Sequence, residues 1–416
     1  MTAEKVRIPD MRNPVLTDVQ RQLLAYTDAN PVTLSADAVI SAAKAQTGLD
    51  YFGDLGFMPR LELVMSAANA DENLSSAGQA GFFGLAVRFL RARLELEDYI
   101  RRHPEIEEVV LDPPIIDAGL PRSGTTYTLQ LLAADQRLRS LQHWEGLRPV
   151  ADPYLKDGKD TRYELAEAEW IEADAISPVA KLTHEFTPDH ITEDIELTGM
   201  DFGGYYHEWF ANIPQWRDYQ YTHDPAPWLG YLRRAIKALV YQRGPSRWVG
   251  KCPQHMEQLA AIVQAFPDAF IVINHRDPVA SIQSAITMMG YAARFTQKRL
   301  DLDQIATYWV DRYERILRRC VEDRDRLDPD RTYDLYFYKL TADPMGEMEA
   351  IYSKAGLQFD AQTRNSLQGA IETNQRGKHG QLVYDLRGDF GLDPARIRER
   401  FRFYFDRFPE VRVEVE

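Results

Sequence analysis

The sequence predicts an α/β protein: a three-layer α/β/α sandwich with a central parallel sheet, preceded by an N-terminal helical region. Apolar runs at residues 114–118, 248–250, 269–274 and 332–338 alternate with segments of helical periodicity. Strands that are apolar throughout are typical of a parallel sheet with helices on both faces. The first of these runs leads directly into a glycine turn and a helical pattern, which is the connection that such folds use.

Composition limits the possible functions. The 416 residues, 44% of them hydrophobic, can bury a large core as one domain or two. A net charge of −14 argues against a nucleic-acid partner. Two cysteines, Cys252 and Cys320, argue against a disulfide scaffold and fit a reducing compartment. We see neither a signal peptide nor a run long enough for a transmembrane segment, so we expect a cytoplasmic protein. We expect no metal site, because no suitable ligand spacing occurs.

The chain divides into an N-terminal helical region, residues 1–105, and a larger domain, residues 106–416. The helical pattern of the first part is clearest over residues 82–100, where arginines and acids, Arg93 among them, predict a solvated outer face. Residues 150–245 are acidic and aromatic and longer than an ordinary crossover. We expect them to form a helical crossover that covers one end of the sheet.

Residues 119–126 form the most informative motif. A strand, a tight turn and a helix N-terminus bring unpaired backbone N–H groups and the helix dipole to one point, which makes an anion site. The spacing from Gly119 to Thr126 matches a Walker A loop, but Thr125 stands where the lysine belongs, and Arg122 supplies a cation inside the loop. The motif therefore predicts a P-loop-like site for a phosphate-bearing ligand that is held differently from ATP.

A second oxyanion site is predicted after the apolar run 269–274. Arg276 follows the run at once, and Asp277 and Pro278 are typical of the start of a helix. Ser281 and Ser284 lie three residues apart and so share one face of that helix. Ligands of parallel sheets bind at the carboxyl edge of the strands. Two anion sites at one edge indicate a nucleotide that is phosphorylated at both ends.

Two further cationic groups belong to this pattern. Lys251 ends a short apolar strand, which would place its ammonium at the same edge, beside the group that is transferred. Near the C-terminus, Arg376 and Lys378 lie in a glycine-flanked loop that ends at Gly380 and is able to fold over a bound anion.

With these motifs in this order, the chain resembles the sulfotransferases that use 3′-phosphoadenosine-5′-phosphosulfate (PAPS), in particular the broad bacterial branch related to the tyrosylprotein sulfotransferases. The resemblance spans residues 114 to about 395. The segment 121–126 is similar to the family's 5′-phosphosulfate loop, Arg276 with Ser284 to its 3′-phosphate pair, and Lys251, in a Lys-x-Pro segment, to its sulfuryl-facing lysine. The loop residues that the resemblance assigns to the donor are Arg122, Ser123, Gly124, Thr125 and Thr126.

Two weaker similarities complete the donor site. Tyr338 resembles the tyrosine that lies near the adenine, although Lys339 replaces the acid that usually follows it. The basic loop resembles the family's C-terminal loop around the 3′-phosphate, with a different spacing; it contributes Arg376, Lys378 and Gly380.

The resemblance implies an enzyme that moves a sulfuryl group from PAPS to a hydroxyl, or an amine, of a small-molecule or lipid-like acceptor, with 3′-phosphoadenosine-5′-phosphate (PAP) as the product and no metal. Lys251 and Arg122 would stabilise charge on the leaving phosphate oxygen. The crossover at residues 150–245 would form the acceptor side. Two alternatives remain: a P-loop kinase or NTPase, and a non-catalytic nucleotide-binding protein.

The general base stays open among several residues. Glu145 occupies a position similar to the catalytic glutamate of the tyrosylprotein branch. His255 follows Lys251 much as a histidine follows the lysine in cytosolic members. His184, Glu193 and Asp194 in the crossover are the remaining candidates. The sequence indicates neither the identity of the acceptor nor the oligomeric state.

Overall fold

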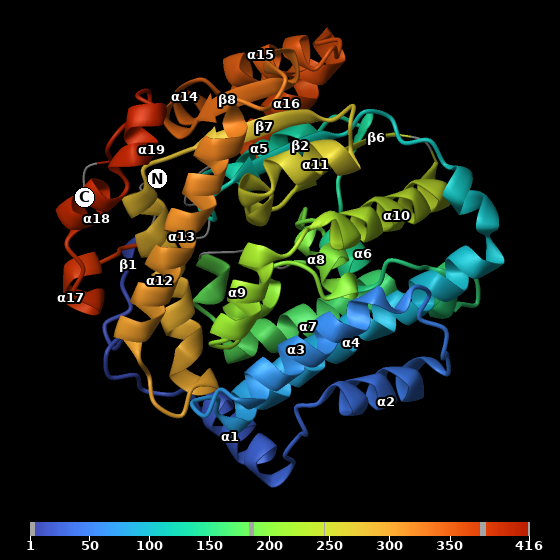
Figure 1. Cartoon of the computed structure of the whole chain (residues 1–416), viewed down its shortest axis with the longest axis vertical. Coiled ribbons are helices and arrows are strands. Elements are labelled where there is room, and N and C mark those ends of the chain that lie inside the picture. Colours follow the sequence, from blue (N-terminus) through green and yellow to red (C-terminus); the bar gives the residue numbers. More distant parts are fainter. Residues whose placement is uncertain (1–4, 183–186, 245, 375–379, 415–416) are drawn as a thin grey trace.

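The computed structural model describes residues 5–182, 187–244, 246–374 and 380–414. Its centre is a five-stranded sheet in the order β3-β6-β2-β7-β8, and every pair of neighbours in it is parallel (Figure 1). The strands are β2 Ile115–Gly119, β3 Leu138–Arg139, β6 Arg247–Lys251, β7 Phe270–His275 and β8 Thr332–Tyr336. The predicted parallel sheet is confirmed. The edge strand β3 was not predicted, because two residues carry no periodicity.

Side chains on both faces of the sheet pack against helices, which gives the three layers. Ile115 of β2 faces one hydrophobic cluster, and its neighbour Ile116 faces another. The first cluster packs the sheet against α5 Thr125–Ala133, α15 Pro344–Lys354 and α16 Ala361–Thr373. The second packs the opposite face against α10 Ala226–Arg243, α11 Leu259–Ala265, α12 Pro278–Thr296 and α13 Leu302–Arg324. Because successive side chains of a strand point to opposite faces, strands that are apolar throughout need helices on both sides.

The N-terminal helices lie at the end of the molecule opposite α15 and α16 (Figure 1). They are α1 Asp18–Ala29, α2 Ala36–Thr47, α3 Met58–Asn69 and α4 Ser76–Arg102. The predicted helix at residues 82–100 is part of α4, but the expectation that Arg93 is solvated is wrong. Its guanidinium is buried, where it donates to the carbonyl oxygens of Phe52 and Asp54 and to the Asp201 carboxylate, at 2.8 Å from the latter.

The stretch between β3 and β6 is helical and lies between the sheet and the N-terminal helices (Figure 1). A short hairpin interrupts it, formed by β4 Leu155–Lys156 and β5 Lys159–Asp160. Besides α10, its helices are α6 His143–Leu147, α7 Arg162–Ile176, α8 Ile195–Thr198 and α9 Pro214–Thr222.

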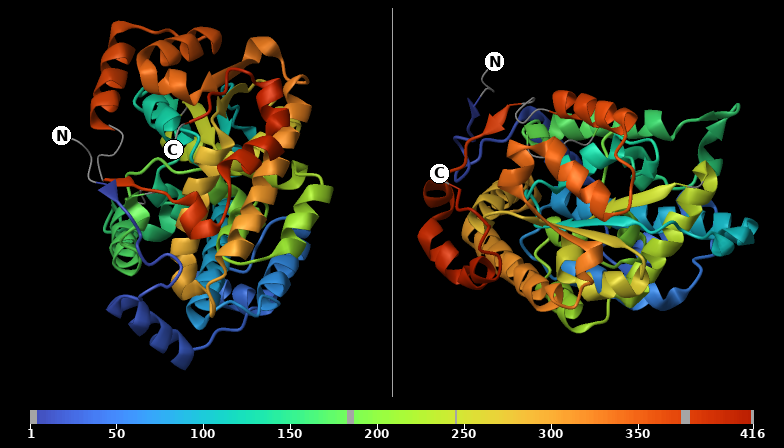
Figure 2. Two further views of the ribbon diagram at one scale, coloured as in Figure 1. Left: turned by 90° about the vertical axis from the view of Figure 1, so that its left-hand side faces the viewer. Right: turned by 90° about the horizontal axis from the view of Figure 1, so that it is seen from above.

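Segments from opposite ends of the chain meet beside this region. β1 Lys5–Val6 pairs in parallel with β9 Gln381–Leu382 (Figure 2).

The run 332–338 that we predicted as one strand ends at Tyr336, because the chain turns there into α14. The remaining helices are α14 Phe337–Ala342, α17 Leu386–Phe390, α18 Pro394–Arg400 and α19 Arg402–Arg407. Within the described part of the chain, no helix has the length and apolar character that crossing a membrane requires.

Candidate active site

Register in the sheet brings the predicted motifs to one edge. Asp117 of β2 lies opposite Lys251 of β6, and Gly119 lies opposite Asn274 of β7. Because all these strands run in the same direction, the loop that follows β2, the end of β6 and the residues that follow β7 share the carboxyl edge of the sheet.

The loop between β2 and α5 has the shape of an anion site. Arg122 and Gly124 adopt left-handed backbone conformations, with φ of 71° and 99°. A side chain at Gly119 would bring a Cβ within 2.7 Å of both Asn274 Cβ and Ser123 Oγ, so only glycine fits there. The Ser123 hydroxyl is buried and has no hydrogen-bond partner among the described residues. A buried donor of this kind is costly unless a ligand satisfies it.

The second predicted anion site directly adjoins this loop. Arg276 donates through Nη1 to the carbonyl oxygen of Arg122, and Arg122 Nε donates to Ser284 Oγ at 3.1 Å. The guanidinium of Arg276 also stacks on the ring of Phe337, 3.9 Å from its centroid. Ser281 Oγ, one turn before Ser284, is buried without a partner in the part of the chain that the structure describes. The structure therefore brings Arg122, Arg276 and Ser284 into direct contact.

Lys251 meets the crossover at the end of β6. Its side chain is 1% exposed, and its ammonium donates to the carboxylate of Glu193. The backbone fixes this contact, because Asp194 N–H donates to the carbonyl oxygen of Lys251 at 2.8 Å. The carboxylate of Asp194 in turn accepts a hydrogen bond from His255 Nε2 at 3.0 Å. Of the base candidates, Glu193 therefore contacts Lys251, whereas Asp194 and His255 bind each other.

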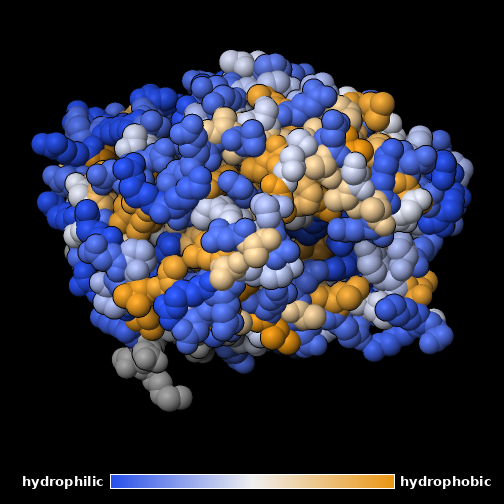
Figure 3. Space-filling view, turned by 90° about the horizontal axis from the view of Figure 1, so that it is seen from below, coloured by the Kyte–Doolittle hydropathy of each residue, from blue (hydrophilic) through white to orange (hydrophobic). Residues whose placement is uncertain are grey.

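One cavity of about 620 Å³ joins these groups. At one end lie Arg122, Thr125 and Thr126 of the loop, and Lys251 and Glu193 lie beside them. The rest of the lining is largely apolar. Much of it comes from α7, α12 and the segment around residues 205–210, and it includes Trp170, Tyr205, Tyr206, Trp209, Phe210, Met288, Met289 and Tyr291. From below, hydrophobic residues surround a hollow in the molecular surface (Figure 3).

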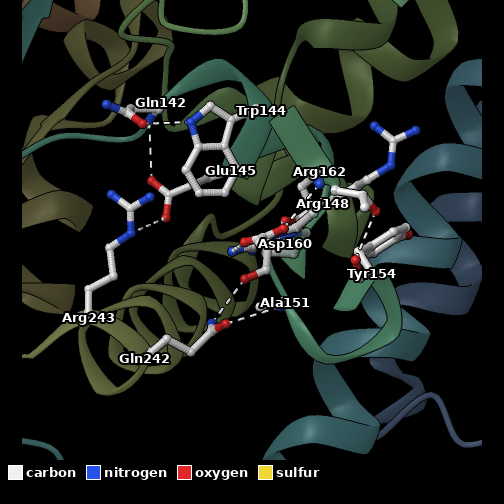
Figure 4. A network of polar contacts seen from close by, with 12 residues as sticks. Gln142, Trp144, Glu145, Arg148, Ala151, Tyr154, Asp160, Arg162, Gln242 and Arg243 are labelled. Atoms are coloured by element: carbon white, nitrogen blue, oxygen red, sulfur yellow. Dashed lines mark hydrogen bonds and ion pairs between the residues drawn. The ribbon is translucent and has the colours of Figure 1, made fainter. Parts of the chain in front are cut away.

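Glu145 lies elsewhere, in a buried ionic cluster on α6. Its carboxylate pairs with Arg139 at 2.8 Å and with Arg243 at 3.1 Å, and it caps the helix by accepting from the backbone of Gln142 (Figure 4). Glu145 is not among the described residues that line the cavity, and neither is His255. Two arginines thus engage the carboxylate that the resemblance suggested as a base.

The remaining predicted residues lie in α14, immediately before β9, or outside the described residues. Tyr338 is in α14, next to Phe337, and Arg412 stacks on its ring at 3.6 Å. Gly380, with φ of 105°, immediately precedes β9. Arg376, Lys378 and His184 lie outside the described residues.

Sequence reasoning missed two groups. The first is the set of cavity residues on α12, Met288, Met289 and Tyr291. They follow Ser284 by about one to two helical turns, and that spacing was the available signal. The second is Glu414, whose carboxylate binds Arg276 at 2.6 and 2.7 Å. No local pattern marks it, because its partner is 138 residues away.

No group of three His, Cys, Asp or Glu side chains in the described ranges is arranged to hold a metal ion. Within the sheet, Asp117 in the middle of β2 is fully buried. Its Oδ1 accepts from Asn274 Nδ2, and its Oδ2 has no partner among the described residues. Burial raises the pKa of the Asp117 carboxyl well above its ordinary value of 3.8, and the nearby Lys251 ammonium opposes that rise.

The fold is that of a P-loop-like protein, and the loop after β2 lines a largely apolar cavity at the carboxyl edge of the sheet. A family model described as Sulfotransferase family matches residues 113–361, and the chain therefore belongs to that family. The omega-hydroxy-beta-dihydromenaquinone-9 sulfotransferases Stf3 of Mycobacterium bovis and Mycobacterium tuberculosis are 28% identical to it over 267 residues, which are 60% of this chain. The match spans 64% of the length of these curated relatives, just under two thirds.

Solved structures have the same fold. The sulfotransferase STF9 from Mycobacterium avium superimposes with a TM-score of 0.82 at 24% identity, over 92% of this chain and 99% of that one. The sulfotransferase STF1 from Mycobacterium tuberculosis has a TM-score of 0.78 at 25% identity, over 88% and 97% of the two chains.

We predict that Asp117→Asn changes the pH dependence of stability. The raised pKa means that the folded chain keeps a proton that the unfolded chain releases above about pH 4, so the free energy of unfolding of the wild type falls as the pH rises. Asparagine has no such proton, so the variant gains stability relative to the wild type between about pH 5 and about pH 8. Urea unfolding at both pH values measures this, and parallel curves for the two proteins would contradict it.

Proposed function

We propose that this protein transfers a sulfuryl group from PAPS to a hydroxyl group of an apolar, lipid-like acceptor. The observation that carries the proposal is the single cavity in which the anion loop, the Lys251–Glu193 pair and an apolar lining meet. An anionic donor and an apolar acceptor could both enter it, and a lysine and a carboxylate lie where the two would meet.

The residues at the sheet edge fit the proposed donor. The loop offers backbone N–H groups at the start of α5, the Ser123 hydroxyl without a partner among the described residues, and the cation of Arg122. Arg276 adjoins it, with the buried Ser281 and the Ser284 hydroxyl nearby. An acidic protein must concentrate its cations locally to bind a ligand with several negative charges, and these contacts support that arrangement.

The proposed chemistry needs a base and a cation. The donor would supply a sulfuryl group, whose bond to the 5′-phosphate oxygen breaks as the acceptor oxygen bonds to sulfur. Lys251 and Arg122 would stabilise the negative charge that develops on the leaving oxygen. Glu193 would accept the proton of the acceptor hydroxyl. If the ammonium of Lys251 turned to a phosphate oxygen, the carboxylate of Glu193 would be available to accept that proton.

The acceptor end of the cavity favours an apolar molecule. Its aromatic and methionine side chains bury apolar surface, and thioether side chains adapt to ligands of irregular shape. The curated relatives are named for a hydroxylated menaquinone derivative, which supports a lipid-like acceptor here.

Calorimetry tests the donor. We expect PAP to bind more tightly than ATP or ADP, because Thr125 replaces the lysine that contacts β/γ-phosphates and Arg276 offers a second anion site. The control is Arg276→Leu, which keeps the loop but removes the second cation and should lower the affinity for PAP alone. A preference for ATP in the presence of magnesium would favour the kinase alternative instead.

Lys251→Ala should lower turnover by roughly 10²-fold, as the loss of one donor to a developing oxyanion does. Turnover is followed by transfer of labelled sulfate from PAPS to hydroxylated lipids. If the Lys251→Ala variant folds correctly and turns over normally, Lys251 takes no part in the reaction.

Glu193→Gln and Glu145→Gln distinguish the two glutamates. We expect Glu193→Gln to lower kcat by about 10²-fold or more, because general base catalysis contributes on this scale. Glu145→Gln should retain kcat but unfold at a lower temperature, since it leaves Arg139 and Arg243 without their buried counter-ion. The reverse pattern would make Glu145 the base.

A further inference from the structure

Segment 409–414 crosses the edge of the sheet at the tips of β7 and β8 and brings a carboxylate onto Arg276. Glu414 Oε1 accepts from Nε of the guanidinium at 2.6 Å, and Oε2 accepts from Nη2 at 2.7 Å. The side chain of Arg276 is 13% exposed and that of Glu414 is 33% exposed, so water screens the pair only in part. This is the bidentate geometry in which an arginine binds a carboxylate or a phosphate.

The segment is held in place by its backbone as well as by this pair. The N–H of Glu414 donates to Asp277 Oδ2 at 2.9 Å, and Arg398 Nη2 donates to the carbonyl oxygen of Glu414 at 3.0 Å. Earlier in the segment, Glu410 pairs with Lys339 at 2.6 Å and Arg412 stacks on Tyr338. These contacts fix the position of the segment, so the Glu414 carboxylate is held next to Arg276 by an ordered backbone.

Arg276 does not depend on Glu414 for its orientation. Its Nη1 donates to the carbonyl oxygen of Arg122 in the loop between β2 and α5, and its guanidinium lies on the ring of Phe337. These contacts would keep the guanidinium at the edge of the loop if the carboxylate left. Nε and Nη2, the two donors that Glu414 occupies, would then be open to another oxyanion.

We propose that Glu414 is an internal competitor for the 3′-phosphate of the nucleotide. The inference rests on the proposed function, in which Arg276 binds that phosphate. A phosphate dianion and the Glu414 carboxylate repel each other and cannot share the same two donors. A nucleotide with a 3′-phosphate therefore binds only when the carboxylate has left, and its apparent affinity falls by the fraction of molecules in which Arg276 is open. The same competition speeds the release of the 3′-phosphorylated product.

Calorimetric titration of PAP into the wild type, Glu414→Gln and Glu410→Gln tests the proposal. Glu410→Gln is a matched control, because it removes the same charge from the same segment without touching Arg276. We expect Glu414→Gln to bind PAP roughly three- to tenfold more tightly, the range of a partly exposed ion pair. Glu410→Gln should bind like the wild type. Adenosine 5′-phosphate, which has no 3′-phosphate, should bind equally to all three proteins.

Equal PAP affinity of the wild type and Glu414→Gln would overturn the proposal. Weaker binding by Glu414→Gln would overturn it as well, because it would mean that the carboxylate orients Arg276 for the ligand. Tighter binding of both PAP and adenosine 5′-phosphate by that variant would likewise count against a competition specific to the 3′-phosphate. If none of the three proteins binds PAP, the proposed donor is wrong and this inference falls with it, which distinguishes the two failures.

Discussion

The parallel sheet places the carboxyl ends of its strands at a single edge, and the candidate site depends on that constraint. Lys251 at the end of β6 and Arg276 after β7 lie more than a hundred residues beyond the loop that follows β2, yet the strand register makes all three neighbours. In a chain with a net charge of −14, this is how cations become concentrated at one point. The long crossover also reaches this edge, where its Glu193 contacts Lys251.

The features that sequence predicted are those with local causes. The strands β2, β6, β7 and β8 were visible because both of their faces are covered, so they are apolar throughout. The anion loop was visible because its glycines are required locally: Gly119 by its contact with Asn274, and Gly124 by its backbone conformation. The helical start after Arg276 was visible because Asp277 caps it. Each of these depends on residues close together in the chain.

The features that sequence did not predict have distant causes. Arg93 has the helical spacing of a solvated residue, but carbonyl oxygens from residues 52 and 54 and a carboxylate from residue 201 surround it. Glu193 and Asp194 are adjacent acids that sequence could not rank. The bond from the Asp194 N–H to the Lys251 carbonyl oxygen distinguishes them, because it directs the neighbouring Glu193 to the ammonium. Glu145 was a further candidate by resemblance, and in the structure Arg139 and Arg243 engage its carboxylate.

The two carboxylates bound to the site's cations, Glu193 on Lys251 and Glu414 on Arg276, have a common physical origin. Cations gathered at one partly buried edge repel one another unless anions lie among them, and these two glutamates supply the negative charge from within the chain. If the proposed function holds, the phosphates of a bound nucleotide supply the negative charge beside Lys251 and Arg276 in place of these glutamates. Glu414 is then displaced, whereas the backbone of Asp194 keeps Glu193 in place while the Lys251 ammonium turns from its carboxylate to the nucleotide. Donor binding would thus create the base that the acceptor requires, so that proton removal becomes effective only after the group to be transferred is present.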